Sequence, residues 1–300
     1  MILSYFKTAR RVITRNRIFS LINIIGLAAS MSVALLFISI LTEMLKYDNF
    51  HEKKDRIVRV ITTSRDAQYD VDLATSSLAL AQEIRENVTE AETITTLGYG
   101  FNGDFKNGDK IQTLKGSWAQ SSLFEVFTFP LVSGNSSTAL TEPNTMVITE
   151  SASKRIFGTT DVLGKSLVRV GTEPGKNPEF VITGVMKDVS KFSHMQFEVL
   201  GSSATNESNN PATNSWTDVW SNHNYVVLRE GVSVRQFQAA LDHIAARRNA
   251  ELGSDNKQII SLDTQRLTNI VFFSKSLDNQ IGATMPTRFF WLISGCRSSY

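Results

Sequence analysis

The chain has 300 residues, of which 42% are hydrophobic and 20% are charged, a composition typical of a folded globular protein. Its formal net charge of +2 does not indicate nucleic-acid binding, because much of the positive excess lies within the first 17 residues. The single cysteine, Cys296, excludes an intrachain disulfide framework and suits a bacterial envelope protein better than a small secreted one.

An apolar stretch from Ile18 to Thr42 contains no charged residue. A helix needs about 20 such residues to cross a bilayer, so we predict a membrane helix over residues 18–45. Asn23, Gly26 and Ser30 are small or polar, and we expect them to pack against another helix in the membrane. The alternative is that small residues are simply common in such helices.

The charges that flank this stretch predict its orientation. The basic residues before it are Lys7, Arg10, Arg11, Arg15 and Arg17, with no acidic residue among them, whereas a mixed set of charges follows it. Excess Lys and Arg remain on the cytoplasmic side, which places the N-terminus inside and the chain after residue 46 outside. A cleaved signal peptide is the alternative, but the apolar run continues about a dozen residues beyond the candidate cleavage region at residues 28–30.

Residues 2–13 carry apolar side chains at helical spacing, with Lys7, Arg10 and Arg11 outside the apolar arc. This pattern predicts that residues 1–17 form a cytoplasmic, basic amphipathic helix on the inner membrane surface. We expect the lipid headgroups of the bilayer to be contacted by Lys7, Arg10, Arg11, Arg15 and Arg17.

Periodic patterns predict an α+β domain over residues 46–286. Strands are expected at residues 56–63, 93–99, 146–149, 166–170, 180–187, 195–200, 224–228 and 258–262, and helices at residues 77–88, 150–157 and 234–248. Residues 56–99 and 224–262 thus form two strand-helix-strand units. We expect these halves to pack together near the membrane, with a β-rich lobe between them in the sequence.

Local signals support two of these helices and one loop. Thr149 is the predicted N-cap of the middle helix and Gly158 its C-terminal stop. Ser233 and Gln236 form a capping-box pair at the start of the last helix. Residues 202–215 are poor in apolar side chains and predict an exposed, mobile loop.

Motifs for catalysis, cofactors or metals are not found in the sequence. Residues 158–166, GTTDVLGKS, are close to the phosphate-binding pattern G-x-x-x-x-G-K-[ST]. Five residues instead of four separate the glycines, however, and the segment follows a predicted helix rather than a strand. No G-x-S-x-G nucleophile motif is present.

The four histidines, His51, His194, His223 and His243, are far apart in the sequence and lack metal-ligand spacing. We therefore expect surface or capping roles for them. Trp216, Trp220 and Tyr225 are interpreted as core residues rather than as the lining of a cleft.

Several blocks carry a family resemblance. They are YDNFHEKKDRIVRV (47–60), SSLFEVFTFPLVSGNSSTALTEPNTMVITESASKRIFG (121–158), DVLGKSL (161–167), FVITGVMKDVSKFSHMQFEVL (180–200) and NYVVLREGVSVRQFQ (224–238). Together with the basic N-terminus and the apolar helix, these blocks resemble the MacB/FtsX-like permease family of ABC transporters, in its Bacteroidetes-type version. The resemblance covers nearly the whole chain.

The resemblance implies a permease with four membrane helices and a large periplasmic core domain between the first and the second. A separate cytoplasmic ABC ATPase would bind its inner side and move the periplasmic domain, for export or extraction of a substrate. The chain itself would then be a non-catalytic permease subunit of the bacterial inner membrane, with no cofactor. The lipid bilayer and a second permease copy are the other expected partners, and nucleic acid is not one.

The sequence departs from this family pattern in residues 287–300. A second apolar run begins there with FFWLISG, but Cys296 and Arg297 follow after about seven apolar residues, too few to span a membrane. We therefore expect a permease fragment that stops at the start of its second membrane helix. The alternative function is a membrane-anchored extracytoplasmic sensor or ligand-binding protein, which would need a cytoplasmic output module. An anchored envelope enzyme is disfavoured by the missing motifs.

Overall fold

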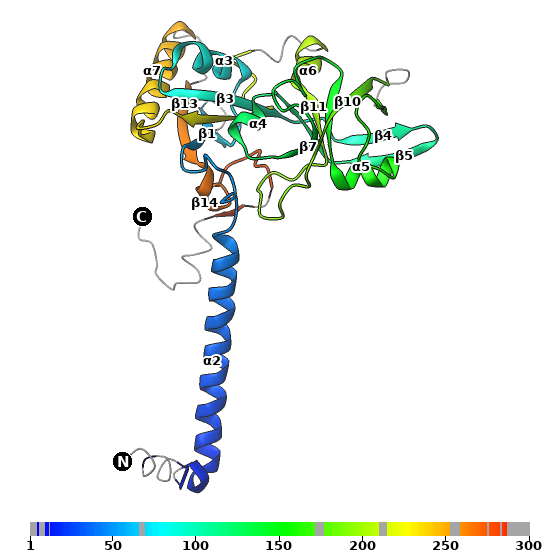
Figure 1. The fold of residues 1–300 in the computed structure, drawn as a ribbon. Helices are drawn as coiled ribbons and strands as arrows, with labels where there is room; N and C mark the ends of the chain where they lie inside the picture. Colours follow the sequence, from blue (N-terminus) through cyan, green and yellow to red (C-terminus); the bar gives the residue numbers. More distant parts are fainter. Residues whose placement is uncertain are drawn as a thin grey trace. The chain divides into compact units, whose positions relative to one another are not determined.

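The computed structural model describes residues 5, 10–11, 13–65, 70–171, 177–209, 215–252, 259–274, 276–282 and 284–286. The chain divides into two compact units, residues 1–46 and residues 47–300 (Figure 1). Most of the predicted surface helix over residues 2–13 lies outside the described residues, as does the predicted start of a second membrane helix.

The first unit contains the predicted apolar helix, α2 (Arg17–Met44). Its most apolar window has a mean hydropathy of 2.5 and buries none of its residues inside the protein. Twenty-eight helical residues rise about 42 Å, more than the roughly 30 Å of a bilayer's hydrocarbon core. A helix that is apolar on all sides and exposes these apolar residues is one that lipid can cover.

The second unit combines helices with one large sheet. Its helices are α3 (Leu78–Asn87), α4 (Leu123–Val126), α5 (Glu150–Phe157), α6 (Ser203–Asn209) and α7 (Val234–Leu252), with the short 3-10 helix η2 (Leu267–Asn269). Its strands are β1 (Ile57–Arg65), β2 (Asp70–Leu73), β3 (Ala91–Gly98), β4 (Gly103–Asn107), β5 (Lys110–Leu114), β6 (Gly116–Ala119), β7 (Leu131–Gly134), β8 (Thr145–Thr149), β9 (Ser166–Arg169), β10 (Glu179–Met186), β11 (Val199–Ser202), β12 (Asn222–Leu228), β13 (Ile259–Arg266), β14 (Phe272–Ser274) and β15 (Met285–Pro286).

The two predicted strand-helix-strand units, β1-α3-β3 and β12-α7-β13, interleave in this sheet. The strand order is β13-β1-β12-β3, and each of these strands is antiparallel to its neighbours. Figure 1 shows α3 and α7 on the same side of these strands. Because side chains alternate along a strand, Val58 and Val60 of β1 face these helices and contact Leu80 and Phe237, whereas Arg59 points to the opposite face.

The same sheet continues without a break into the predicted β-rich lobe. Its order there is β3-β6-β11-β8-β10-β9-β4-β5, and β6-β11 and β8-β10 are parallel pairs. Phe101, Phe105 and Phe180 are almost completely buried in the core of this lobe, under α5. The predicted α+β class and its two halves are therefore confirmed.

The capping predictions are also confirmed. The Thr149 hydroxyl accepts a hydrogen bond from the backbone N–H of Ala152 at 3.4 Å, and Gly158 ends α5 with a φ of 76°. The Ser233 N–H donates to Oε1 of Gln236 at 2.9 Å, and the Gln236 N–H donates to the Ser233 hydroxyl at 3.3 Å.

The predicted mobile loop over residues 202–215 is wrong where the structure describes it. Ser202 belongs to β11, and α6 follows it. Thr205 of this helix is buried, and its hydroxyl accepts a hydrogen bond from the Asn144 N–H at 2.7 Å. Small polar side chains that bond to a neighbouring loop stabilise this helix, and low apolar content does not reveal such contacts. Residues 210–214 lie outside the described residues.

Candidate functional site

The described basic residues of the predicted membrane surface are exposed. Arg10, Arg11 and Arg15 precede α2, and Arg17 is its first residue. Lys7 lies outside the described residues. Contact between these side chains and lipid headgroups stays a prediction.

The three predicted helix-packing residues are exposed on one face of α2, because positions 23, 26 and 30 are three and four residues apart. A Cβ atom added at Gly26 would meet no atom within 4 Å, so the helix surface is open there. The Ser30 hydroxyl donates to the Leu27 carbonyl at 3.0 Å, which satisfies it within its own helix. Packing of this face against a second helix stays a prediction.

The most unusual feature of the second unit is a chain of buried polar side chains below the sheet. Asp48, His51, Arg59, His194 and Tyr225 are each at most 1% exposed, and we call this set the buried polar chain. Arg59 and Tyr225 come from neighbouring strands, where they are direct cross-strand partners. The other three residues come from loops, so the set is brought together only by folding.

Asp48 is held against the loop that carries His194. The Asp48 N–H donates to the Phe192 carbonyl at 2.7 Å, and Oδ1 of Asp48 accepts from the His194 N–H at 3.1 Å. Its Oδ2 lies 2.8 Å from Nδ1 of His194, an ion-pair distance whose geometry is not that of an aligned hydrogen bond. Asp48 adopts a φ of 54°, a left-handed conformation that aspartate tolerates better than most residues.

Tyr225 joins this ion pair to a buried guanidinium. Nε2 of His194 lies 2.9 Å from the Tyr225 hydroxyl, and the Arg59 side chain faces the same phenol. Burial raises the pKa of Tyr225 and lowers the pKa of Arg59, because both ionised forms lose their hydration. The phenol is therefore neutral and can donate its proton to Nε2 of His194, so one neutral hydroxyl lies between the Arg59 guanidinium and the His194–Asp48 contact.

His51 lies at the other end of the buried polar chain, with its Nε2 4.0 Å from Oδ1 of Asp48. Its Nδ1 accepts a hydrogen bond from the Thr128 N–H at 3.0 Å, and its ring packs edge-on against Phe127 and Phe129. Burial is the main cause that lowers the pKa of His51 from 6.5 to about 4. The neutral imidazole therefore serves as the acceptor for this backbone amide.

A second set of polar contacts, beside the buried polar chain, leads toward the surface from His223, whose ring stacks on that of Tyr225. Nδ1 of His223 lies 3.1 Å from the Ala74 carbonyl, and its Nε2 lies 2.8 Å from the Tyr99 hydroxyl. Tyr99 is 42% exposed and donates to the Asn279 carbonyl at 2.7 Å. Burial lowers the pKa of His223, which keeps this ring neutral as well.

Two expectations from the sequence are therefore wrong. His51, His194 and His223 are buried instead of occupying surface or capping positions, and only His243 is exposed. Trp220 is 44% exposed and is not a core residue, whereas Tyr225 is completely buried as expected. The histidine prediction failed because sequence separation says nothing about which loops meet below the sheet.

The chemistry available at this network is structural rather than catalytic. Every nitrogen and oxygen of the His194–Tyr225 contact is buried, so a substrate has no access to it. Within the described parts of the chain, no three His, Cys, Asp or Glu side chains gather to hold a metal ion. What the network does is tie loops from distant parts of the sequence to the centre of the sheet.

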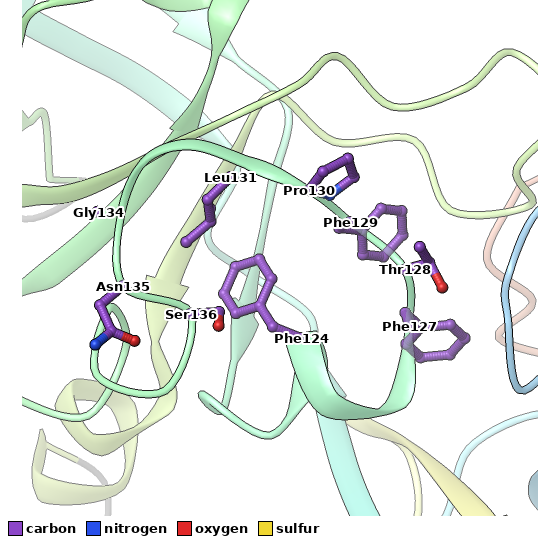
Figure 2. Close-up of a pocket in the computed structure, with 9 residues that line it drawn as sticks. All are labelled: Phe124, Phe127, Thr128, Phe129, Pro130, Leu131, Gly134, Asn135 and Ser136. Atoms are coloured by element: carbon purple, nitrogen blue, oxygen red, sulfur yellow. The ribbon is translucent and has the colours of Figure 1, made fainter.

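A separate cleft of about 550 Å³ lies along residues 124–136. Figure 2 shows the side chains of Phe124 and Leu131 directed toward each other in this cleft, with Pro130 and Phe129 farther along the same stretch. None of its nine lining residues is ionisable, so the cleft can receive an apolar group but cannot perform acid-base chemistry.

Comparison with known families finds a match to one family model. The model of the MacB-like periplasmic core domain matches residues 20–244. No curated protein matches the chain.

Solved structures share the fold at low sequence identity. A domain of a protein assigned as a permease in Porphyromonas gingivalis is 24% identical, with a TM-score of 0.63, and the match covers 81% of this chain and 98% of that one. The periplasmic region of MacB from Actinobacillus actinomycetemcomitans is 15% identical, with a TM-score of 0.50 and coverage of 72% and 91%. At these identities the likeness concerns the fold.

Proposed function

Because this chain belongs to the family of MacB-like periplasmic core domains of ABC-type permeases, we propose that ATP hydrolysis by a separate cytoplasmic ATPase moves its periplasmic domain. The movement would serve export or extraction of a substrate. The chain itself would be a permease subunit that does no catalysis.

One observation carries this proposal: a domain with the periplasmic fold of these permeases follows a helix long and apolar enough to cross a membrane. This combination fits an inner-membrane protein with a periplasmic domain. In the proposed arrangement residues 1–17 are cytoplasmic, residues 18–45 span the membrane, and residues 46–286 are periplasmic. Residues 287–300 would then return the chain to the membrane.

The basic residues and the open helix face have roles in this proposal. Arg10, Arg11 and Arg15 would contact anionic lipid at the inner surface, each with up to about 1 kcal/mol of attraction. The face with Asn23 and Gly26 would pack against a membrane helix of a second permease copy. A small residue at position 26 lets two helix backbones approach closely.

A topology experiment tests the arrangement. Alkaline phosphatase fused after residue 200 is active only outside the cytoplasm, so an active fusion is expected. A matched fusion after residue 15 should be inactive because it places the enzyme inside. An inactive fusion at residue 200 would contradict the proposed orientation.

A reconstitution experiment tests the coupling. The full chain and an ABC ATPase from the same cell are placed together in liposomes, and ATP hydrolysis is measured with and without the chain. We expect the chain alone to hydrolyse no ATP, because the GTTDVLGKS segment follows α5 and lacks the spacing of a P-loop. We expect the permease in its full-length form to change the rate of the ATPase, and an unchanged rate with that form would count against the coupling.

A further inference from the structure

Two segments that lie far apart in the sequence meet at the buried polar chain. The post-helix segment, residues 47–51, follows the membrane helix unit, and the strap, residues 276–282, comes shortly before residue 287. Each segment contacts residues of the buried polar chain.

The post-helix segment is fixed by an aromatic contact and by polar ones. The Tyr47 ring packs edge-on against Phe192 and Phe272, with ring centroids 5.9 and 5.7 Å apart. Asp48 follows with its bonds to the Phe192 carbonyl and the His194 amide. The position of this segment therefore depends on where the His194 loop lies.

The strap contacts the same loop from another direction. Gly282 has a φ of 73°, and a Cβ atom added there would lie only 2.2 Å from the His194 carbonyl oxygen. No side chain fits at this point, so the strap backbone rests directly on the backbone of His194. Gln280 binds the other end of the polar chain, because its Oε1 accepts from Nη2 of Arg59 at 2.9 Å.

Tyr225 is the link between these two attachment points. Its hydroxyl bonds to His194, which holds Asp48, and its phenol faces Arg59, which holds Gln280. The His194–Tyr225 contact lies between a buried guanidinium and a buried carboxylate. Inside the protein these charges interact strongly because the local dielectric constant is low, and the loss of one hydrogen bond leaves its buried partner unsatisfied.

We propose that the buried polar chain couples the post-helix segment to the strap, so that loosening one segment loosens the other. Asp48, His194 and Tyr225 are positioning residues in this device. Removing the Asp48 charge leaves His194 free to turn, which weakens its bond to Tyr225 and the backbone support for Gly282. The coupling is a property of the domain, and it stands or falls independently of the ATPase proposal.

Hydrogen exchange of the full chain in detergent tests the coupling. The Asp48 amide reports on the post-helix segment, because it donates to the Phe192 carbonyl at 2.7 Å. The Asp278 amide reports on the strap, because it donates to the Asp72 carbonyl at 2.8 Å. Exchange at both is measured relative to strand β8 in the β-rich lobe, which corrects for any change in global stability.

Two variants act at different points of the chain. Asp48→Asn removes the carboxylate at the post-helix end, and we expect exchange in the strap to rise about tenfold. Tyr225→Phe keeps the ring and removes the hydroxyl, and we expect exchange to rise in both segments. Ser202→Ala is the control, since it removes a buried hydroxyl that donates to the Leu140 carbonyl at 2.9 Å in the other lobe.

The two segments must respond together for the coupling to hold. A rise in both segments with Tyr225→Phe, and in neither with Ser202→Ala, supports the proposal. Strap exchange within twofold of the wild type in Asp48→Asn, with faster exchange at the post-helix segment, overturns it. If Asp48→Asn does not fold, Tyr225→Phe decides alone, and a rise in only one segment contradicts the coupling.

Discussion

The second unit should lose stability in mild acid through His51. Its pKa falls from 6.5 in the unfolded chain to about 4 in the folded one, so the unfolded state takes up a proton first as the pH drops. The His51 contribution is complete above pH 6.5 and is lost as the pH falls toward 4. At about 1.36 kcal/mol per pH unit, the maximum loss is about 3 kcal/mol, with about 2 kcal/mol lost at pH 5.

Burial of the ring is the main cause of the lowered pKa of His51, and protonation would also break the hydrogen bond that the ring accepts from the Thr128 N–H. Protonation turns Nδ1 of His51 from an acceptor into a donor, so the buried amide loses its partner. The measurement is urea unfolding of the full chain in detergent at pH 7.5, 6 and 5, followed by tryptophan fluorescence. His51→Gln removes the titrating group, and its stability should fall less over this range than that of the wild type.

His223 also has a lowered pKa and adds to the acid sensitivity of both proteins, so the difference between wild type and variant isolates His51. His243→Gln serves as the control, because this histidine is exposed and the variant should follow the wild-type curve. Equal pH dependence of wild type and His51→Gln would refute the assignment of the acid loss to this side chain.

Substitutions at three further positions test other parts of the structure by the same unfolding measurement. Gly282→Ala should cost about 1–2 kcal/mol or more, because alanine is strained at a φ of 73° and its Cβ meets the His194 carbonyl; an unchanged midpoint would mean that the strap does not rest there. Ser233→Ala should cost about 1 kcal/mol through the lost capping box, whereas Ser233→Thr should retain most of it. Phe127→Ala should cost about 3–5 kcal/mol because the ring is 1% exposed in the core below the sheet, and a loss under 1 kcal/mol would contradict that packing.

The elements of the fold could be predicted because their signals are local. Hydrophobic period and capping residues are properties of short stretches, and they placed α5 and α7 within a few residues. The interleaving of the two halves is not local, because β1 lies between β12 and β13 only after the chain has passed through the whole β-rich lobe. Sequence patterns indicate that two such units exist and do not show how their strands alternate.

The buried polar chain was missed for a related reason, although one signal was available. Arg59 interrupts the apolar run Ile57–Ile61 of a strand that is buried on both faces. A charged residue at such a position must find partners inside the protein, so it predicts a polar network without naming its members. His194 and Asp48 come from loops whose positions depend on tertiary contacts alone.

The energetics of Arg59 favour a role beyond stability. Its guanidinium is completely buried, and its Nε and Nη1 atoms have no hydrogen-bond partner among the described residues, while Nη2 is bonded to Gln265 and Gln280. An apolar side chain of similar size would avoid the desolvation cost of this charge, and buried ionic groups are often no more stable than such replacements. An apolar side chain would not favour one orientation of the strap, because apolar packing depends little on the orientation of the partner group. A buried cation that bonds to Gln280 and faces Tyr225 selects one arrangement, which is the property that a coupling between residues 47–51 and 276–282 requires.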